Sequence, residues 1–589
     1  MVSRHFHNQS GAFAGRGPFY EIEVFMRNLS AVPGPAIVRR LRQGTFVALL
    51  AVASSIPAWG AACKVTPAHP PSEAELVFLK GDHAKAATML QADLAKTPND
   101  PDKTALLVRA LLWQGKTAEA SDVITKALGA HADSPTLLTE KAEVLFRQGR
   151  PWDVGNALAA ALKVDQCFPR AFILYAWLSN AQSNHAVAHK AVQTAHQLDP
   201  NDLEIWQYWL NTLTLKQRIA AIDAGPPSGP TEDEKEKKQR QNHIDYLKKL
   251  ADEPPKPCRL VSNSASADLP LQSIIRQGRG GGLATSAWAL NVGINGHESL
   301  LQVDTGASGL LVSKAVADHA DLRSSGAEPI VGFGDEGPQH GFRAYADSIR
   351  IGSLEFKDCA VRVFEKGMGG SDGLIGADVF SRFLVTIDYP VHKIKLDPLP
   401  LPPNHAEIET PSLSTTEVDS ADLQAAASSS DAAGAAPRLT DRYIAPEMKD
   451  WVPIYHVGHN LIVPASLRPP DVRLFLVDTG AWSTIVAPEA AREVTKVDLN
   501  NGMQMGGLNG AVNKNYVAEV LDIKFGGISK HELGVPSMSM DMESMYSAMN
   551  ISGLLGADIL EELTIHIDYR DGLMKFEYDP KRGYHPLNH

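Results

Sequence analysis

Two stretches of this 589-residue chain repeat the same ordered set of short motifs, and this duplication limits the folds that the chain can adopt. The decapeptide VDTGASGLLV at 303–312 is echoed by VDTGAWSTIV at 477–486. Further on, GLIGADVF at 373–380 is echoed by GLLGADIL at 553–560, and an Ile-Asp-Tyr triplet follows each copy. The interval from the motif Asp to the last Gly of the second motif is 72 residues in one copy and 78 in the other. An ordered set at near-equal spacing predicts two copies of one domain.

Each Asp-Thr-Gly triplet ends an apolar run, LLQVDTG in the first copy and LFLVDTG in the second. An apolar run that stops at a turn signal predicts a buried strand, so each run is expected to deliver a carboxylate into a tight turn. The two carboxylates belong to Asp304 and Asp478. We predict that they lie face to face as one acid–base pair, because the duplication supplies one from each domain.

The duplicated motifs resemble the retropepsin-like branch of the aspartic protease superfamily. A lone Asp-Thr-Gly is a weak signal, whereas two, each paired with Leu-Ile-Gly or Leu-Leu-Gly at matching distance, form a specific pattern. The resemblance covers roughly half of the chain. It implies two all-β lobes that form a pseudo-dimer with one active site in the cleft between them. The implied activity is that of an aspartic-type endopeptidase acting on a peptide or protein substrate.

The resemblance also assigns supporting roles around the carboxylate pair. The motif threonines are expected to send their hydroxyls across the lobe interface to the opposing main chain. The motif glycines have no side chain and let the two turns approach each other. The glycines of the second motif are expected to pack behind the aspartates. These supporting residues are Thr305, Gly306, Gly376, Thr479, Gly480 and Gly556.

Two neighbouring carboxylates that share one proton can hydrolyse a peptide bond unaided, so neither a metal nor a cofactor is predicted. The charged carboxylate takes a proton from water, and the neutral one donates to the carbonyl oxygen. Like charges this close cannot both ionise, an effect for which the aspartic-protease pair is the standard example. Ala307 and Ala481 stand where pepsin-like enzymes carry a hydroxyl that stabilises the ionised form. We therefore predict a weakly acidic pH optimum.

Glycine-rich stretches between the two motifs of each copy predict hairpins. They contain Gly332 and Gly334 in the first copy, and Gly507 and Gly510 in the second. Each hairpin is either a flap that closes over the substrate and excludes water or an ordinary turn, and the sequence does not choose between them.

Trp482 departs from the family pattern, because the first copy has Ser308 at the equivalent position. The indole either lines a substrate subsite or fills the cleft and blocks the pair. The second case leads to the alternative function, a catalytically impaired protease fold that holds peptides as a scaffold. Another alternative pairs each lobe with the same lobe of a second chain. Of the other recurring aspartates, Asp388 and Asp568 are interpreted as turn residues between the last strands.

The region before the duplication, residues 70–224, is rich in Ala and Leu and carries a repeat. Gly81, Gly115 and Gly149 are each 34 residues apart, and Ser183 continues the series. This period resembles tetratricopeptide repeats, which form an all-α solenoid with a concave face that binds a peptide or partner protein. The alternative is a helical bundle without repeats. Residues 203–222 are predicted to form a terminal capping helix.

Composition changes mark the remaining boundaries. The charged segment 225–258 is expected to be a linker with a solvated helix, held by charge pairs. Strand-like alternation begins near 259 and continues to 398 as lobe 1. The low-complexity segment 399–438 is predicted to be a flexible linker, and 439–589 is predicted to be lobe 2.

The N-terminal segment 1–62 has the order of a secretory signal peptide, basic, then apolar, then small. The true start is expected at Met26 if the preceding residues are not translated. The chain is therefore expected to be exported, to the periplasm or outside the cell. A buried helix is the alternative reading of the apolar run. A second alternative makes Cys63 a lipid anchor, and membrane attachment is expected only in that case.

Charge and cysteine usage exclude other classes. The net charge of −12 argues against nucleic-acid binding. Four cysteines without a CxxC pair exclude a thiolate metal site and a disulfide-rich scaffold, although one disulfide stays open. His185 and His189 are four residues apart, but no third metal ligand is evident, so a solvated helical face is the preferred interpretation.

Overall fold

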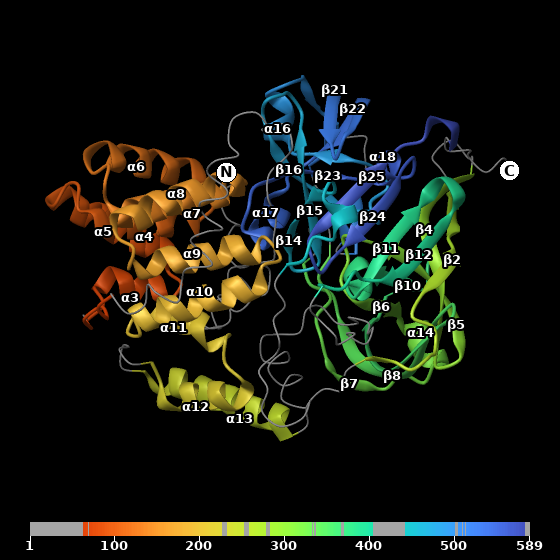
Figure 1. Ribbon diagram of the computed structural model, residues 1–589, viewed down its shortest axis with the longest axis horizontal. Helices are drawn as coiled ribbons and strands as arrows, with labels where there is room; N and C mark the ends of the chain where they lie inside the picture. The colour runs from red at the N-terminus through yellow and green to blue at the C-terminus, as the bar shows by residue number, and fades with distance from the viewer. Residues whose placement is uncertain are drawn as a thin grey trace, which may run out of the picture.

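The computed structural model describes residues 63–68, 70–226, 232–252, 258–277, 283–332, 334, 337–366, 370–403, 442–500, 505–508, 510–512 and 514–582. The predicted signal peptide, the proposed start at Met26 and most of the low-complexity linker lie outside these residues. Figure 1 shows a helical part beside two β-rich lobes, lobe 1 in green and lobe 2 in blue. None of the described helices is long and apolar enough to cross a bilayer.

The helical part consists of successive helix pairs whose starts recur every 34 residues. The first helices of four pairs begin at Pro101, Pro135, Pro169 and Leu203, and the second helices keep the same interval from His83 to His185. The full series is α3 (Glu73–Leu79), α4 (His83–Lys96), α5 (Pro101–Leu112), α6 (Thr117–Ala130), α7 (Pro135–Arg147), α8 (Pro151–Val164), α9 (Pro169–Asn180), α10 (His185–Leu198), α11 (Leu203–Leu210), α12 (Leu215–Ala224) and α13 (Glu234–Asp252).

The turn inside each pair explains the recurring glycines. Gly81, Gly115 and Gly149 have φ values of 84°, 72° and 70°, in the left-handed region that glycine adopts without steric cost. Ser183 stands at the fourth turn with φ 42°, so a non-glycine residue adopts the same kind of conformation there. The period therefore reflects one backbone turn used again and again, and it tolerates the Ser183 departure.

Charged side chains link the first helices of several pairs. Arg170 on α9 pairs with Glu140 and Glu143 on α7, and also with Glu204 on α11 at 2.9 Å. Arg109 on α5 reaches the same Glu204. Burial is the main cause that raises the pKa of Glu140 to about 7, against the opposing effect of Arg170. The network ties helices separated by up to three pairs into one unit.

The charged segment after the repeats is more than a solvated linker. Its helix α13 buries Ile244, Leu247 and Leu250 against an apolar cluster that includes Trp206 and Ile222. The predicted single capping helix is wrong as well, because the chain breaks at the Thr214 N-cap and forms α11 and α12. Helix α13 thus covers the last helix pair, since its apolar residues at three-residue spacing share one face.

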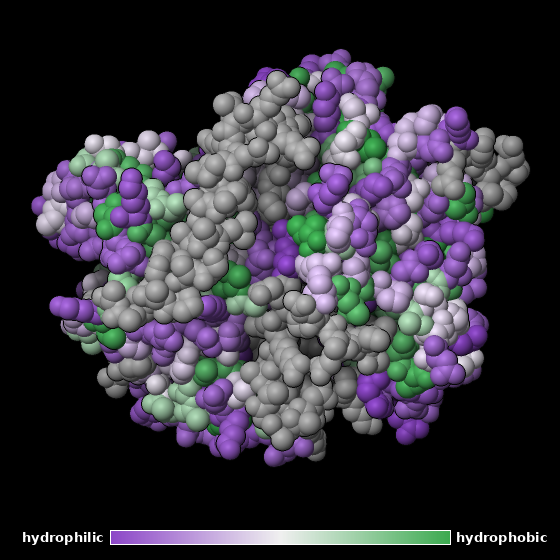
Figure 2. Space-filling model, in the orientation of Figure 1, coloured by the Kyte–Doolittle hydropathy of each residue, from purple (hydrophilic) through white to green (hydrophobic). Residues whose placement is uncertain are grey.

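The helical part packs directly on lobe 2. The backbone N–H of Asn550 donates to the carbonyl of Arg147 at 2.9 Å. Gly149 lies so close that a Cβ atom added to it would be 2.5 Å from the Asn550 carbonyl oxygen. One continuous apolar core includes Phe146 and Trp177 of the helical part together with residues of both lobes. In the face drawn in Figure 2, the helical part is mostly hydrophilic with scattered apolar residues.

All four cysteines are in disulfides. Cys63 is joined to Cys167 in the helical part, and Cys258 to Cys359 in lobe 1. The sulfur of Cys63 cannot be in a disulfide and in a lipid thioether together, so this bond and the lipid-anchor alternative exclude each other. The chain holds two disulfides where the sequence left one open.

Lobe 1 is built on one mixed sheet. A hairpin turns at Asn295 and Gly296, where Ile294 pairs with His297. The sheet has the order β1-β9-β6-β10-β5-β4-β8-β7, with β3 added beside β4. Its strands are β1 (Arg259–Leu260), β3 (Gln272–Gln277), β4 (Leu283–Ile294), β5 (His297–Asp304), β6 (Leu310–Ser313), β7 (Ser324–Ala327), β8 (Gly341–Ile351), β9 (Leu354–Phe364) and β10 (Gly373–Gly376), with helix α14 (Lys314–His319) after β6.

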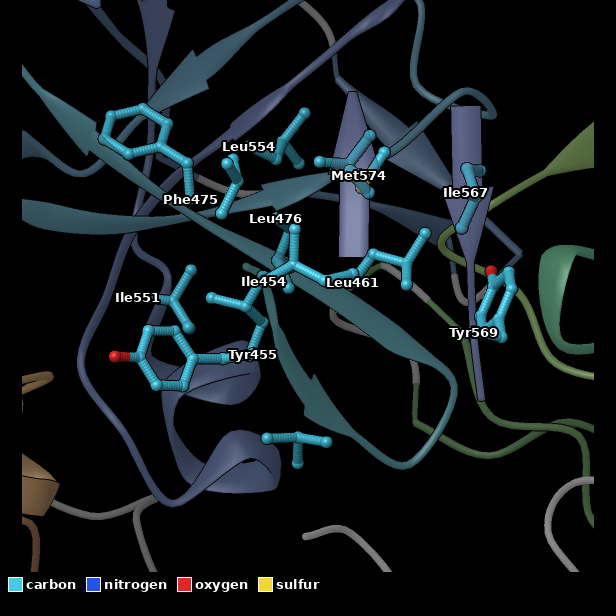
Figure 3. Close-up of a cluster of buried hydrophobic side chains, with 14 of the residues drawn as sticks. Ile454, Tyr455, Leu461, Phe475, Leu476, Ile551, Leu554, Ile567, Tyr569 and Met574 are labelled. Atoms are coloured by element: carbon cyan, nitrogen blue, oxygen red, sulfur yellow. The ribbon is translucent and has the colours of Figure 1, made fainter. Parts of the chain in front are cut away.

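Lobe 2 repeats this plan with shorter strands, in the order β14-β15-β16-β23-β17-β22-β21-β18. Figure 3 shows part of its core, where Ile454, Leu461, Leu476, Leu554 and Met574 gather. Its elements are β14 (Tyr455–Val457), β15 (Asn460–Ser466), β16 (Arg473–Val477), β17 (Ile485–Val486), α16 (Pro488–Arg492), β18 (Val497–Leu499), β19 (Gly506–Gly507), β20 (Gly510–Ala511), β21 (Tyr516–Phe525), β22 (Ile528–Ser537), α17 (Asp541–Ser547), β23 (Ile551–Leu555) and α18 (Ala557–Leu560).

A third sheet belongs to both lobes. It runs β13-β25-β24-β11-β12-β2, and its central pair joins β11 of lobe 1 to β24 of lobe 2, with Leu384 opposite Asp568. Asp388 and Asp568 end these two strands, which agrees with their interpretation as turn residues. The strands are β2 (Ala267–Pro270), β11 (Phe383–Asp388), β12 (Lys393–Pro398), β13 (Val452–Pro453), β24 (Thr564–Asp568) and β25 (Leu573–Glu577).

Candidate active site

Each motif aspartate stands at the end of a strand in the middle of its sheet. In lobe 1, β10 runs parallel to β5 and places Gly376 opposite Asp304, while β6 lies antiparallel on the other side of β10. In lobe 2, β23 runs parallel to β16 and antiparallel to β17 in the same way. The backbone N–H of Asp478 donates to the carbonyl of Leu555 at 3.0 Å. The two lobes therefore present their aspartates on equivalent turns.

Four hydrogen bonds between the motif threonines and the opposing main chain lock these turns together. The Thr305 hydroxyl donates to the Val477 carbonyl at 2.6 Å and accepts from the Thr479 N–H at 2.9 Å. The Thr479 hydroxyl donates to the Val303 carbonyl at 3.0 Å and accepts from the Thr305 N–H at 3.0 Å. Both threonines are buried. The structure thus places these hydroxyls across the lobe interface, as the resemblance implied.

The glycines that follow the threonines lie directly against the carboxyls of the other lobe. A Cβ atom on Gly306 would be 2.8 Å from Asp478 Cγ, and one on Gly480 would be 2.3 Å from Asp304 Cγ. Real Cβ atoms do not approach other atoms this closely, so no other residue fits without movement. The absence of a side chain at both positions is what lets the two carboxyls meet.

The carboxyls of Asp304 and Asp478 lie close enough for each to influence the protonation of the other, and both pKa values are raised. Burial, followed by the charge of Asp478, raises the pKa of Asp304 well above its ordinary value. Burial also raises the pKa of Asp478, while the N–H groups of Gly480 and Ala481 act in the opposite direction. These donors approach Asp478 Oδ1 at 2.9 Å and 3.0 Å. Asp478 Oδ1 accepts two backbone N–H groups where Asp304 Oδ1 accepts one, from Gly306, so Asp304 holds the shared proton more readily than Asp478.

The glycines of the second motif pack behind the aspartate turns. A Cβ atom on Gly376 would be 2.4 Å from the Ala307 carbonyl oxygen, and one on Gly556 would be 2.3 Å from the Ser483 carbonyl carbon. Asp378 and Asp558, two residues further on, were given no role from the sequence. Asp378 accepts the Gly309 N–H at 2.8 Å, and Asp558 accepts the Thr484 N–H at 2.8 Å. The recurrence of these two aspartates in both copies was the sequence feature that could have indicated a structural role.

A pair of tyrosines under the turns also escaped sequence reasoning. They are Tyr389 and Tyr569 of the two Ile-Asp-Tyr triplets, and both are buried. Burial raises the pKa of the Tyr389 phenol, and the side chain of Thr479 acts in the opposite direction. Trp288 of lobe 1 donates its indole N–H to Glu561 of lobe 2 at 2.8 Å. The Trp288–Glu561 contact joins the two lobes, and the two tyrosines are buried near the aspartate turns.

The glycine-rich stretches are hairpins in both lobes. In lobe 1, Ile330 pairs with Gln339, and the intervening Gly332 and Gly334 lie outside any strand. In lobe 2, Gly507 pairs with Gly510, and Leu508 stands at the tip. Leu508 packs against a lobe 1 cluster of Leu311, Ile330, Phe364 and Leu374, against which Ala307 of the Asp304 turn also packs. The lobe 2 hairpin therefore reaches across to lobe 1.

Trp482 and Ser308 have opposite environments. The Trp482 side chain is 52% exposed, whereas Ser308 is buried and its hydroxyl accepts from Arg362 at 2.8 Å. An indole that filled the cleft would be buried by the cleft walls. The exposed indole therefore does not support the interpretation in which Trp482 blocks the carboxylate pair.

Comparisons with known proteins find similarity to one family model and to solved structures. A family model described as gag-polyprotein putative aspartyl protease matches residues 290–382, which include Asp304 and Gly376. Among solved structures, the crystal structure of aspartic proteinase from Irpex lacteus is similar to this chain at 14% sequence identity and a TM-score of 0.32. That similarity covers 54% of this chain and 98% of the other. A search of curated proteins finds no match.

Proposed function

We propose that the protein is an aspartic-type endopeptidase with one active site, in which Asp304 and Asp478 activate a water molecule. The observation that carries the proposal is the close approach of two carboxyls, one from each lobe, each set against the motif glycine of the other lobe. Peptide hydrolysis requires an acid and a base, and the carboxyl of Asp304 and the carboxylate of Asp478 can serve as these two groups.

The reaction follows from the protonation states. The Asp478 carboxylate takes a proton from water, and the resulting hydroxide equivalent attacks the carbonyl carbon of the peptide. The Asp304 carboxyl donates its proton to the carbonyl oxygen, giving a tetrahedral diol. Collapse of the diol breaks the C–N bond: one diol hydroxyl returns its proton to Asp304 as the new C=O forms, and the proton held by Asp478 moves to the departing amine. Both carboxyls return to their starting states.

The lobe 2 hairpin is proposed to act as a flap. Its tip residue Leu508 contacts the lobe 1 cluster next to Ala307, so the hairpin spans the side of the cleft where a substrate would lie. Gly507 and Gly510 flank the tip and allow it to bend. A closed hairpin would exclude bulk water and strengthen the electrostatic interactions of the pair.

The helical part is proposed to be a tetratricopeptide-like solenoid that binds the substrate or a partner protein. The 34-residue interval between helix starts supports this assignment. Its packing on lobe 2 would hold a bound protein near the cleft. Export to the periplasm or outside the cell is also proposed, and the two disulfides support it, because disulfides persist in oxidising compartments.

Asn substitutions at the pair test the proposed activity. Purified wild type is expected to cleave a reduced and alkylated protein, and Asp304→Asn and Asp478→Asn are each expected to abolish the cleavage. Asp522→Asn, on the surface of lobe 2, is the matched control. Activity that survives Asp304→Asn would exclude the shared pair. Partial activity in both single variants would instead indicate two independent sites, one for each lobe with a second chain.

A further inference from the structure

The carbonyl groups of the two motif glycines each accept a hydrogen bond from a side chain of the opposite lobe. Gln302 of lobe 1 donates its Nε2–H to the Gly480 carbonyl at 3.2 Å. His459 of lobe 2 lies with Nε2 at 3.0 Å from the Gly306 carbonyl oxygen. A carbonyl can only accept, so the Nε2 of His459 must carry the proton of this bond. These contacts are additional to the four threonine bonds.

Each of these carbonyls belongs to a peptide unit whose N–H is hydrogen-bonded within an aspartate turn. The N–H of Ala481, in the same planar unit as the Gly480 carbonyl, donates to Asp478 Oδ1 at 3.0 Å. The N–H of Ala307, in the same unit as the Gly306 carbonyl, donates to the main-chain carbonyl of Asp304 at 3.1 Å and is the smallest of the influences that oppose the rise in the pKa of the Asp304 carboxyl. Because a peptide unit is rigid, a donor on its oxygen also fixes the direction of its N–H. Hydrogen bonding at the oxygen further polarises the N–H toward the carboxyl.

The two donors come from unrelated places in the fold. Gln302 is buried on β5, two residues before Asp304, and lobe 2 has Leu476 at the equivalent place. His459 lies in the two-residue turn between β14 and β15, after Gly458 with φ 58°. The duplication therefore explains neither donor, because Gln302 and His459 do not occupy equivalent positions in the two lobes.

We propose that Gln302 and His459 are positioning residues that hold the peptide units beside Asp478 and Asp304 from the opposite lobe. The kinetic consequence rests on the proposed peptidase function. The positions themselves do not touch the reacting atoms, so their effect passes through the N–H groups of Ala481 and Ala307.

The two positions are expected to affect opposite sides of the pH–rate profile. Loss of the His459 donor weakens the N–H beside Asp304, which carries the proton, so the pKa of Asp304 rises and the alkaline limb moves to higher pH. Loss of the Gln302 donor weakens the N–H beside Asp478, which must be ionised, so the acidic limb moves to higher pH. The apparent pKa values belong to the pair, so the informative quantity is which limb moves farther.

Substitutions with matched geometry test the assignment on the full-length protein. Gln places an amide N–H near the position of histidine Nε2, whereas Asn places it near Nδ1. His459→Asn is therefore expected to lower kcat about tenfold with little change in KM, below the effect of deleting a direct oxyanion donor. His459→Gln is expected to recover most of the lost kcat. Gln302→Leu, which installs the lobe 2 residue, is expected to lower kcat similarly. His531→Asn, on an exposed strand, is the control.

A readout that does not depend on turnover keeps the two proposals separate. The carboxyl ¹³C resonances of Asp304 and Asp478, assigned by their loss in the Asn variants, report each titration directly. A titration that shifts to higher pH in His459→Asn but not in His459→Gln supports the positioning role of His459 even if no substrate is cleaved. Unchanged carboxyl titrations in His459→Asn and Gln302→Leu would overturn it. A KM that falls in His459→Asn with kcat unchanged would also overturn it, because the histidine would then be competing with substrate.

Discussion

Gly480 faces Asp304 at a distance that leaves no room for any side chain, since a Cβ atom there would lie 2.3 Å from the carboxyl carbon. The same relationship between Gly306 and Asp478 is looser, at 2.8 Å. The two lobes thus share the same motif, but a side chain at Gly480 would clash more severely than one at Gly306.

Gly480→Ala is expected to reduce peptidase activity by at least about a hundredfold, because the methyl group displaces the carboxyl that carries the proton. Gly306→Ala is expected to cost less, since its contact is longer. Steady-state kinetics on one peptide substrate compares the two. Gly129→Ala on helix α6 is the control, because a Cβ atom there meets nothing within 4 Å. Equal losses at Gly306 and Gly480 would contradict the proposed asymmetry.

Thr305→Val is expected to destabilise the protein by about 2 kcal/mol or more, because it leaves the buried Val477 carbonyl and Thr479 N–H without partners. Thr305→Ser keeps the hydroxyl and is expected to lose much less. Urea denaturation followed by tryptophan fluorescence compares the midpoints. The idea that the threonine hydroxyl joins the lobes would be excluded if Val and Ser gave the same midpoint.

Introducing a hydroxyl at the alanines tests the predicted pH optimum. Activity requires one proton on the pair, and burial together with the charge of Asp478 raises the pKa of Asp304, so activity should extend toward neutral pH. In Ala307→Ser and Ala481→Ser, the new hydroxyl stabilises an ionised carboxyl, lowers its pKa and is expected to move the profile to lower pH. A wild-type optimum near pH 2 would falsify the proposed role of the alanines.

Glu561→Gln is expected to remove a pH dependence from the contact between the lobes. Burial raises the pKa of Glu561 to about 7, so the folded protein holds this proton more tightly than the unfolded chain. The contribution of Glu561 to stability is therefore greatest at low pH and declines as pH rises from about 4.5 to about 7. Gln keeps an oxygen that accepts from Trp288 but does not titrate. Melting temperatures between pH 4 and 8 should fall less in the variant than in the wild type.

Reduction of the disulfides is expected to destabilise the protein. Their loops span 101 and 104 residues, and removing one native disulfide commonly costs about 2–5 kcal/mol. Cys63→Ala and Cys258→Ala, each with its partner also changed to Ala, separate the contributions by thermal unfolding. The intact mass of exported protein should match two disulfides and no lipid. A diacylglyceryl mass on Cys63 would show that the first bond does not form in the cell.

The sequence was sufficient for the part of the site that the duplication repeats. The aspartates, threonines and glycines recur in both copies, so their pairing across the cleft could be predicted before any coordinates existed. Asp378 and Asp558 recur as well, and their role was missed only because a carboxylate that accepts backbone N–H groups has no sequence signature distinct from a surface residue.

The contacts that occur once could not be predicted in this way. Gln302 and His459 reach turns that lie more than 150 residues away along the chain, and neither has an equivalent in the other lobe. Four cysteines allow three pairings, and only the fold selects among them. The spacing of Ile244, Leu247 and Leu250 indicated that one face of α13 is buried, but the high charge of the segment led to the prediction of a solvated helix.

The ladder between β11 and β24 makes the two halves of the cleft inseparable within one chain. An enzyme assembled from two identical subunits loses its active site on dilution, and its cell can regulate it through the monomer–dimer equilibrium. This chain carries that junction as covalently tethered strands, so its specific activity should not depend on enzyme concentration. Regulation of the proposed peptidase would then act on access to the carboxyl pair or on delivery of the substrate.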